Sequence, residues 1–163
     1  MLLSGSLTEY FSPGGHAMEI QELHPADARD VQRLILEIFS GPPWNNSWDT
    51  EQLRLYVQEL LGGSGSLSWG LYEAGQLIGM ALGRVKHWCA GTEYWMEEFG
   101  IHPKRQGSGL GSQFLSQVER QIRARGMTGI VLLTERTVPA YYFYQKHGFS
   151  EQPKQVFFTK VWE

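Results

Sequence analysis

FGIHPKRQGSGLG, at residues 99–111, is the most informative stretch of this sequence. Apolar and aromatic residues precede it and an apolar pattern with helical spacing follows it, so it is expected to join a strand to a helix. Glycine lets the backbone adopt positive φ angles and approach a ligand closely. The N–H groups of residues 106–111 can therefore converge on one anion, aided by the positive end of the helix dipole. The stretch predicts a cradle for a pyrophosphate group.

Two other glycine-rich phosphate loops fit this stretch poorly. A P-loop carries Lys and then Ser or Thr after its last glycine, whereas Ser112 and Gln113 follow Gly111 here. A dinucleotide-binding fold places its loop after the first strand and an acidic residue about 20 positions later. On these residues alone, an ordinary glycine-rich turn remains an alternative.

Two motifs together resemble the GNAT superfamily of N-acetyltransferases. In the first, a strand that ends in a hydrophobic-x-Pro turn is followed by [Arg/Gln]-x-x-Gly-x-[Gly/Ala], and Gln106, Gly109 and Gly111 take its three defining positions. The second is Tyr-x-x-x-Gly-Phe, which YQKHGF at residues 144–149 resembles. Thr137 departs from the family pattern, in which an Asn often contacts the cofactor. The resemblance implies an acetyl-CoA-dependent enzyme that acetylates an amine.

The remaining periodicity predicts an α/β (α+β mixed) chain, and the resemblance implies the GNAT-type acyl-CoA N-acyltransferase fold, a mixed central sheet flanked by helices. Helices are expected from Pro25 to before Gly41, from about Thr50 to Leu61, from Gly109 to Arg125, and from Pro139 to before Gly148. Strands are expected at 18–23, 69–72, 77–82, 93–101, 130–133 and 155–162. The apolar run at 130–133 is typical of a central strand covered on both faces.

Length and composition indicate one globular domain, expected at residues 18–163. The chain has 163 residues, of which 42% are hydrophobic and 19% charged. Residues 1–17 are rich in Gly, Ser and Pro without periodicity, which indicates a flexible extension or residues added by cloning. The net charge of -3 and the lack of a Lys/Arg run argue against nucleic acid as a partner.

Other features narrow the location and the chemistry. No apolar run is long enough for a membrane helix or a signal peptide, so we expect neither a membrane nor export. Cys89 is the only cysteine, which excludes an internal disulfide and favours a reducing, cytoplasmic setting. The histidines lack metal-ligand spacing, so no metal is expected. Dimers are frequent in the family, and the resemblance is compatible with a homodimer.

The resemblance also assigns the donor half of the site. The backbone of the strand before the loop would hold the pantetheine arm and polarise the thioester carbonyl. The loop and the start of the helix would hold the phosphates, with serine hydroxyls adding hydrogen bonds. The cofactor-binding residues are then Phe99, Gly100, Ile101, Gln106, Gly107, Ser108, Gly109, Leu110, Gly111 and Ser112.

Acetylation of an amine needs a proton acceptor, because an alkyl amine with a pKa near ~10.4 is protonated at neutral pH. Glu97 and Glu98 precede the predicted thioester contact, and successive strand residues point to opposite faces unless a bulge intervenes. Glu97 is favoured, because aminoglycoside 6'-N-acetyltransferases, which this strand resembles, often carry an acid or histidine there. Two solvated glutamates are the alternative. The family motif makes Tyr144 the acid that protonates the leaving thiolate.

The acceptor is expected to be a small cation. Trp44 and Trp48 follow the first helix, where the family builds its acceptor wall, and Trp95 lies beside the carboxylates. Aromatic rings with carboxylates suit an aminoglycoside, a polyamine or a similar amine. Packing of the tryptophans in a small core is the alternative. Acetylation of a peptide lysine or N-terminus, or acyl-CoA binding without catalysis, also remains open.

Overall fold

The structure is a computed structural model that describes residues 7–11 and 17–163. The chain divides into two units, residues 1–133 and 134–163, and each is described by itself. In the first unit, the described strands form one six-stranded sheet in the order β1-β2-β3-β4-β5-β6. The strands are β1 (Leu7–Phe11), β2 (Ala17–Glu22), β3 (Trp69–Glu73), β4 (Gln76–Trp88), β5 (Gly91–Ile101) and β6 (Gly129–Val131). β1 to β5 pair antiparallel and β5 pairs with β6 in parallel, which confirms the predicted mixed sheet.

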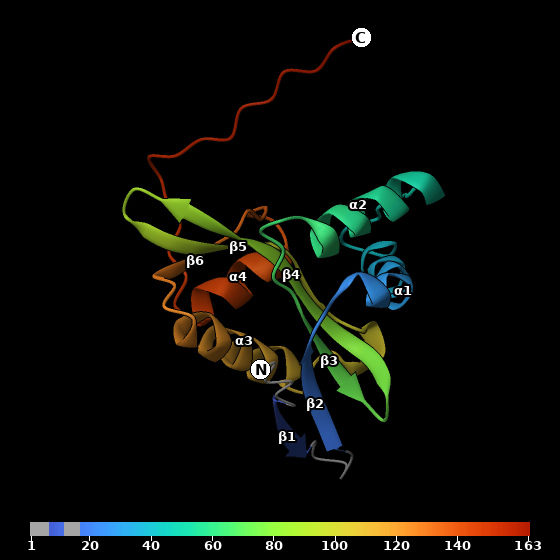
Figure 1. Cartoon of the computed structure of the whole chain (residues 1–163). Helices are drawn as coiled ribbons and strands as arrows, with labels where there is room; N and C mark the ends of the chain where they lie inside the picture. The colour runs from blue at the N-terminus through green and yellow to red at the C-terminus, as the bar shows by residue number, and fades with distance from the viewer. Residues whose placement is uncertain (1–6, 12–16) are drawn as a thin grey trace. The chain divides into compact units, whose positions relative to one another are not determined.

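Helices cover both faces of this sheet (Figure 1). They are η1 (Pro25–Asp27), α1 (Ala28–Phe39), α2 (Thr50–Gly62), η2 (Pro103–Arg105) and α3 (Leu110–Ala124). The buried stripes of α1 and α2 form one core cluster with Met80 and Leu82 of β4. On the other face, Phe114 of α3 stacks on Phe99 of β5 with ring centroids 5.6 Å apart. β5 therefore has α1 and α2 on one side and α3 on the other.

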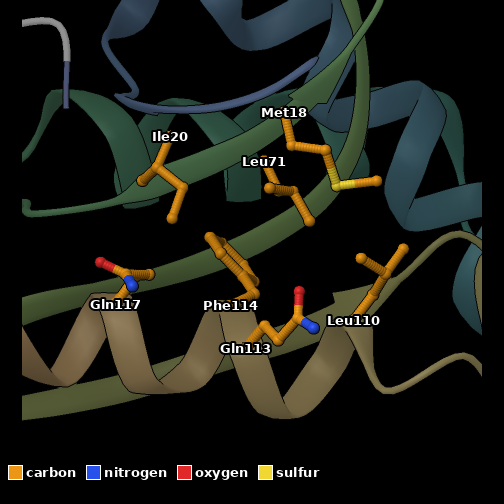
Figure 2. A pocket seen from close by; sticks show the side chains of 7 residues that line it. All are labelled: Met18, Ile20, Leu71, Leu110, Gln113, Phe114 and Gln117. Carbon is orange, nitrogen blue, oxygen red and sulfur yellow. The ribbon is translucent and has the colours of Figure 1, made fainter. Parts of the chain in front are cut away.

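The core between α3 and the strands contains one small cavity (Figure 2). Its volume is about 10 Å³, and it is lined by Met18, Ile20, Leu71, Leu110, Gln113, Phe114 and Gln117. Two glutamines and five apolar side chains project into this space from α3, β2 and β3. A volume of this size holds at most about one water molecule, so it belongs to the core and is not a substrate site.

Helix boundaries agree closely with the sequence. Asp49 caps α2, and its carboxylate accepts hydrogen bonds from the N–H groups of Glu51 and Gln52 at 3.0 and 3.1 Å. Both helices bury an apolar stripe, Val31, Leu34, Ile35 and Ile38 in α1 and Leu53, Val57, Leu60 and Leu61 in α2. The turn between β3 and β4 is also where the sequence predicts it, although β4 continues to Trp88.

Three expectations differ from the structure. Leu7–Phe11, inside the predicted flexible extension, forms β1 and pairs with β2, while residues 1–6 and 12–16 lie outside the described residues. The run at 130–133 was predicted to be a central, doubly covered strand, but β6 is the last strand in the described sheet and Leu133 is 71% exposed. The predicted strand at 155–162 is wrong: residues 156–163 form neither strand nor helix. β propensity alone does not make a strand, because its hydrogen bonds need a neighbouring strand.

The second unit contains α4 (Pro139–Lys146), which begins at the predicted proline. Glu151 organises the residues around it. Its carboxylate accepts hydrogen bonds from Arg136 and from the hydroxyl of Tyr141, the latter at 2.8 Å. Gly148 follows the helix at φ +84°. This confirms the predicted stop of the helix before Gly148.

Candidate functional site

The glycine loop has the geometry of an anion cradle. Gly107 and Gly109 have φ angles of +77° and +82°, and Gly109 caps the N-terminus of α3. A Cβ added to either glycine would meet no atom within 4 Å, so open space lies beside the backbone there. Among the backbone hydrogen bonds of the described residues, none uses the N–H of Gly107, Ser108 or Gly109. These donors, with the start of α3, fit a diphosphate.

Side chains fix the loop in this shape. The Gln106 amide donates to the carbonyl of Ile101 at 2.9 Å, and the Ser108 hydroxyl donates to the carbonyl of Arg105 at 2.9 Å. Arg105 forms an ion pair of 2.6 Å with Glu73, next to the turn between β3 and β4. The loop is thus tied to the end of β5 and to the sheet, which keeps its N–H groups aligned without a ligand.

β6 pairs with only part of β5. Their parallel register covers only Glu93, Tyr94 and Trp95 of β5, opposite residues 129–131 of β6. β5 continues to Ile101, paired with β4 on its other side. The stretch that β6 leaves runs from the two glutamates through Phe99, Gly100 and Ile101 to the glycine loop. The sequence predicts that the backbone of residues 99–101 in this stretch holds the pantetheine arm.

A bulge in β5 determines how the two glutamates point. Leu82 pairs with Glu98 and Gly83 with Met96, so Glu97 has no partner position on β4. Glu97 is an exposed side chain 3.4 Å from Arg84, which follows Leu82 by two positions and so lies on the same face of β4. Glu98 points toward α2. The bulge therefore brings both carboxylates to the face of α1 and α2, rather than to opposite faces.

Glu98 is the more sheltered of the two carboxyl groups. It is part-buried, and its Oε1 accepts a hydrogen bond from the Tyr56 hydroxyl at 2.6 Å. Burial raises the pKa of Glu98, the hydrogen bond from Tyr56 lowers it, and the nearby charge of Glu97 raises it further, with a net upward shift. A carboxyl group with a raised pKa is suited to accept a proton near neutral pH.

The predicted acceptor residues lie in different surroundings. Trp48 stacks on Tyr56 with ring centroids 5.2 Å apart and an angle of 20°, and its buried Nε1 has no hydrogen-bond partner within the described part of the chain. Trp44 packs edge-on against Phe39 and the core cluster, as the packing alternative expects. Trp48 is therefore connected to Glu98 through Tyr56, whereas Trp44 mainly completes the core.

Trp95 already has a cation against its ring. The ammonium of Lys86 lies 4.0 Å from the centroid of Trp95 and 4.6 Å from that of Trp88. Trp95 also donates from Nε1 to Glu93 at 3.0 Å. Trp95 pairs across the strands with Arg84, so its ring lies on the same face as Glu97. On this face of the sheet, the ring of Trp95 therefore already contacts an ammonium group, that of Lys86.

Tyr144 lies on α4, in the second unit. Its ring contacts Phe143 and Phe149, with centroids 5.5 and 5.3 Å away. Its role as an acid stays a prediction. Thus, in the first unit, Glu97 and Glu98 lie on one face of the sheet, Tyr56 connects Glu98 to Trp48, and β5 leads from the glutamates to the residues predicted to bind the cofactor.

Sequence reasoning missed Tyr56 and Lys86. Tyr56 follows Leu53 by three positions and precedes Leu60 by four, which places it on the edge of the buried stripe of α2. That spacing could have identified it as a side chain facing the sheet. Lys86 and Trp88 alternate in a way typical of a strand, but they lie beyond the predicted end of β4.

A mixed sheet whose strand β5 leads through a glycine loop into the start of α3 is the arrangement that the resemblance to N-acetyltransferases implies. The sequence profile of the Acetyltransferase (GNAT) family matches residues 29–149, and the chain belongs to this family. An uncharacterized N-acetyltransferase ycf52-like protein of Prochlorococcus marinus is 37% identical over 71 residues. That match covers 40% of this chain and 37% of the relative's length.

Solved structures support the same fold. The ribosomal-protein-alanine N-acetyltransferase of Brucella melitensis biovar Abortus 2308 has a TM-score of 0.73 and 14% identity, covering 89% of this chain and 100% of its own. An aminoglycoside acetyltransferase from an uncultured soil metagenomic sample, in complex with sisomicin, has a TM-score of 0.71 and 14% identity, with coverages of 90% and 97%. Aminoglycoside N-acetyltransferase AAC(6')-Iy in complex with CoA has a TM-score of 0.66 and 20% identity, with coverages of 91% and 97%.

Within residues 7–11 and 17–163, no helix has the length and apolar character needed to cross a bilayer. In the same ranges, no three His, Cys, Asp or Glu side chains are grouped as a metal site requires. A cytoplasmic location and a homodimer stay predictions from the sequence.

Proposed function

We propose that this chain transfers an acetyl group from acetyl-CoA directly to a primary amine of a small cationic acceptor. One observation carries the proposal. The part of β5 that β6 leaves begins at two carboxylates and ends at a loop suited to a diphosphate. A donor held along this stretch would present its reactive end toward the carboxylates. The CoA complex of AAC(6')-Iy supports the donor's identity.

The donor half of the site needs mainly backbone groups. The N–H groups at residues 107–111 would bind the diphosphate, and the backbone of residues 99–101 would align the pantetheine arm as an added strand. Acetyl-CoA supplies the activated acetyl group. A backbone donor near the thioester carbonyl would stabilise the charge that develops on its oxygen.

Glu98 is the proposed proton acceptor. The sequence favours Glu97, but the contacts favour its neighbour, because Glu98 is part-buried and held by Tyr56 while Glu97 is 40% exposed and paired with Arg84. Glu98 would take the proton of the acceptor's ammonium group, directly or through one water, and so free the amine lone pair. Glu97 would then act through its charge, which favours the protonated form of Glu98 and a cationic substrate.

Tyr144 is the proposed acid for the leaving thiolate. Support comes from its place in the YQKHGF motif and from the matched range of the family, which includes residue 144. A phenol can donate this proton when it is held close to the sulfur. Tyr144→Phe should therefore slow thiol release while acetyl-CoA binding is retained.

Charge and aromatic rings favour a cationic acceptor. Glu93, Glu97 and Glu98 all come from β5, and Trp95 holds an ammonium group of the chain itself. The buried Nε1 of Trp48 can donate to an oxygen of the acceptor. The similar sisomicin-bound aminoglycoside acetyltransferase supports an aminosugar among the candidates.

A turnover assay tests the proposed function. Purified protein is mixed with acetyl-CoA and a panel of aminoglycosides, polyamines, peptides with a lysine, and peptides with a free N-terminus, and the released thiol is followed. Faster release with the small cations than with the peptides supports the proposal. Turnover on peptides alone would mean protein acetylation, and acetyl-CoA binding without any turnover would mean a binding module.

A further inference from the structure

Tyr56 contacts both halves of the proposed acceptor site. Its hydroxyl donates to Glu98 at 2.6 Å, and its ring lies against Trp48 at 5.2 Å between centroids. Tyr56, on α2, therefore links Trp48, in the loop after α1, to the carboxyl group of Glu98 on β5.

The position of Tyr56 is fixed by its helix. Leu53, Val57 and Leu60 on the same side of α2 are buried in the core cluster. Asp49 caps the helix and directly follows Trp48. The tryptophan is thus joined to the first turn of the helix that carries Tyr56, and the rings are nearly parallel. Side-chain packing and the cap leave Tyr56 little freedom to release Glu98.

Charged groups on three elements affect this contact. Glu97 on β5 lies near Glu98 and is paired with Arg84 on β4. Glu59 lies on α2, and its charge, like those of Glu98 and Glu97, raises the pKa of Tyr56. Burial is the largest cause of that rise, so Tyr56 keeps its proton and acts as a donor. A neutral donor facing Glu98 stabilises the ionised carboxylate against the neighbouring negative charge of Glu97.

We propose that Tyr56 is a positioning residue that couples acceptor binding at Trp48 to proton acceptance by Glu98. The inference rests on the proposed function and adds a residue to its acceptor half. When an acceptor packs against Trp48, the stacked Tyr56 ring holds the Glu98 carboxylate in a fixed place relative to it. Tyr56 itself exchanges no proton with the substrate.

The hydroxyl and the ring can be tested separately. Tyr56→Phe keeps the ring against Trp48 and removes only the donor to Glu98. It should lower kcat more than it changes the KM of the acceptor, and the acidic limb of kcat/KM should move to higher pH by about half a unit to one unit. Trp48→Leu keeps the hydroxyl and removes the stack, so it should mainly raise the acceptor KM.

The experiment measures pH profiles for the wild type, both variants and Tyr72→Phe. Tyr72 packs against the same core cluster, and within the described residues no hydrogen bond joins it to Glu98. Tyr72→Phe therefore controls for the loss of a tyrosine hydroxyl. In parallel, NMR of a ¹³C-labelled glutamate carboxyl, assigned with Glu98→Gln, gives the titration midpoint of Glu98. This readout does not depend on turnover.

The outcomes separate the inference from the function beneath it. A higher Glu98 midpoint and a shifted profile in Tyr56→Phe alone support the inference. Turnover by the wild type with an unchanged profile and midpoint in Tyr56→Phe overturns the inference and leaves the function standing. No turnover by the wild type with any amine overturns the proposed function and this inference with it. Equal shifts in Tyr72→Phe also overturn it.

Discussion

A bulge in β5 gives the adjacent residues Glu97 and Glu98 different surroundings. Regular alternation would turn Glu97 and Glu98 to opposite faces, whereas the bulge brings both toward α1 and α2. One then pairs with Arg84 in solvent and the other contacts Tyr56 under α2. The sequence predicts both glutamates as candidate bases, and it predicts that they point to opposite faces unless a bulge intervenes. It could not rank them, because burial and the contact with Tyr56 depend on residues far away in the chain.

Replacing each glutamate with glutamine tests which of the two accepts the proton of the amine. Glu98→Gln should lower kcat/KM for the acceptor at neutral pH by about 100-fold or more, because a positioned base contributes that much. Glu97→Gln should have a much smaller effect, since its carboxylate is exposed. Acetyl-CoA affinity should be unchanged in both, as measured by calorimetry. A larger loss in Glu97→Gln would restore the base that the sequence favours.

Stability should depend on pH through Glu98. Burial raises its pKa, so between about pH 4.3, where an unfolded glutamate titrates, and the higher folded value, the folded state binds more protons. The free energy of unfolding contributed by Glu98 therefore falls as pH rises through this window. Glu98→Gln removes this dependence, while its side-chain oxygen can still accept from Tyr56.

Urea denaturation of both proteins from about pH 4 to about pH 7 checks this sign. Glu98→Gln should gain stability relative to the wild type as pH rises. Parallel curves would mean that Glu98 titrates as it does in the unfolded chain, and a relative loss for the variant would mean that its folded pKa is lowered.

Among the helices and strands, those with sequence signals that act locally are predicted correctly. The cap at Asp49, the stripe of α1 and the glycines before α3 act within a few residues, so the sequence predicts those helices well. Pairing between strands is not local. The apolar run at 130–133 and the β-forming residues at 155–162 had strand propensity, but their neighbours in the sheet could not be deduced from it.

The glycine loop predicts a selective loss of binding. Gly109→Val places a branched side chain at φ +82° in the open space beside the loop, so coenzyme A binding should become undetectable by calorimetry. Gly126→Val is the matched control, since Gly126 follows the other end of α3 at φ +74° with equally open space. Both variants should lose similar stability. Loss of affinity in both would show that strain, and not the cradle, matters.

Removing the charge of Lys86, on the hairpin of β4 and β5, is expected to raise the affinity for the acceptor. Lys86→Gln removes a positive charge from the rings of Trp88 and Trp95 and leaves them to a cationic substrate. The KM of a cationic acceptor should fall several-fold. Arg33→Gln removes the same charge from α1 and serves as the control. An unchanged or higher KM in Lys86→Gln would place the acceptor's ammonium elsewhere.

The second unit ends in a segment without helix or strand, residues 155–163. Val156, Phe157, Phe158, Val161 and Trp162 are 71–87% exposed in that segment. Because these side chains bury little area, deletion of residues 156–163 should leave Tm unchanged within about 2 °C. Calorimetric melting of both proteins measures this. A fall of several degrees would mean that the segment pairs as a strand, as its sequence suggests.

The proposed donor site requires that amides of the glycine loop bind the diphosphate of coenzyme A. The most direct measurement is a ¹⁵N NMR titration of the labelled chain with coenzyme A. The amide signals of Gly107, Ser108, Gly109 and Gly111 should shift most and saturate together, with smaller shifts at residues 99–101. Saturable binding that leaves those loop signals in place would rule out the glycine loop as the diphosphate site, and no shift at any amide would rule out coenzyme A as a ligand.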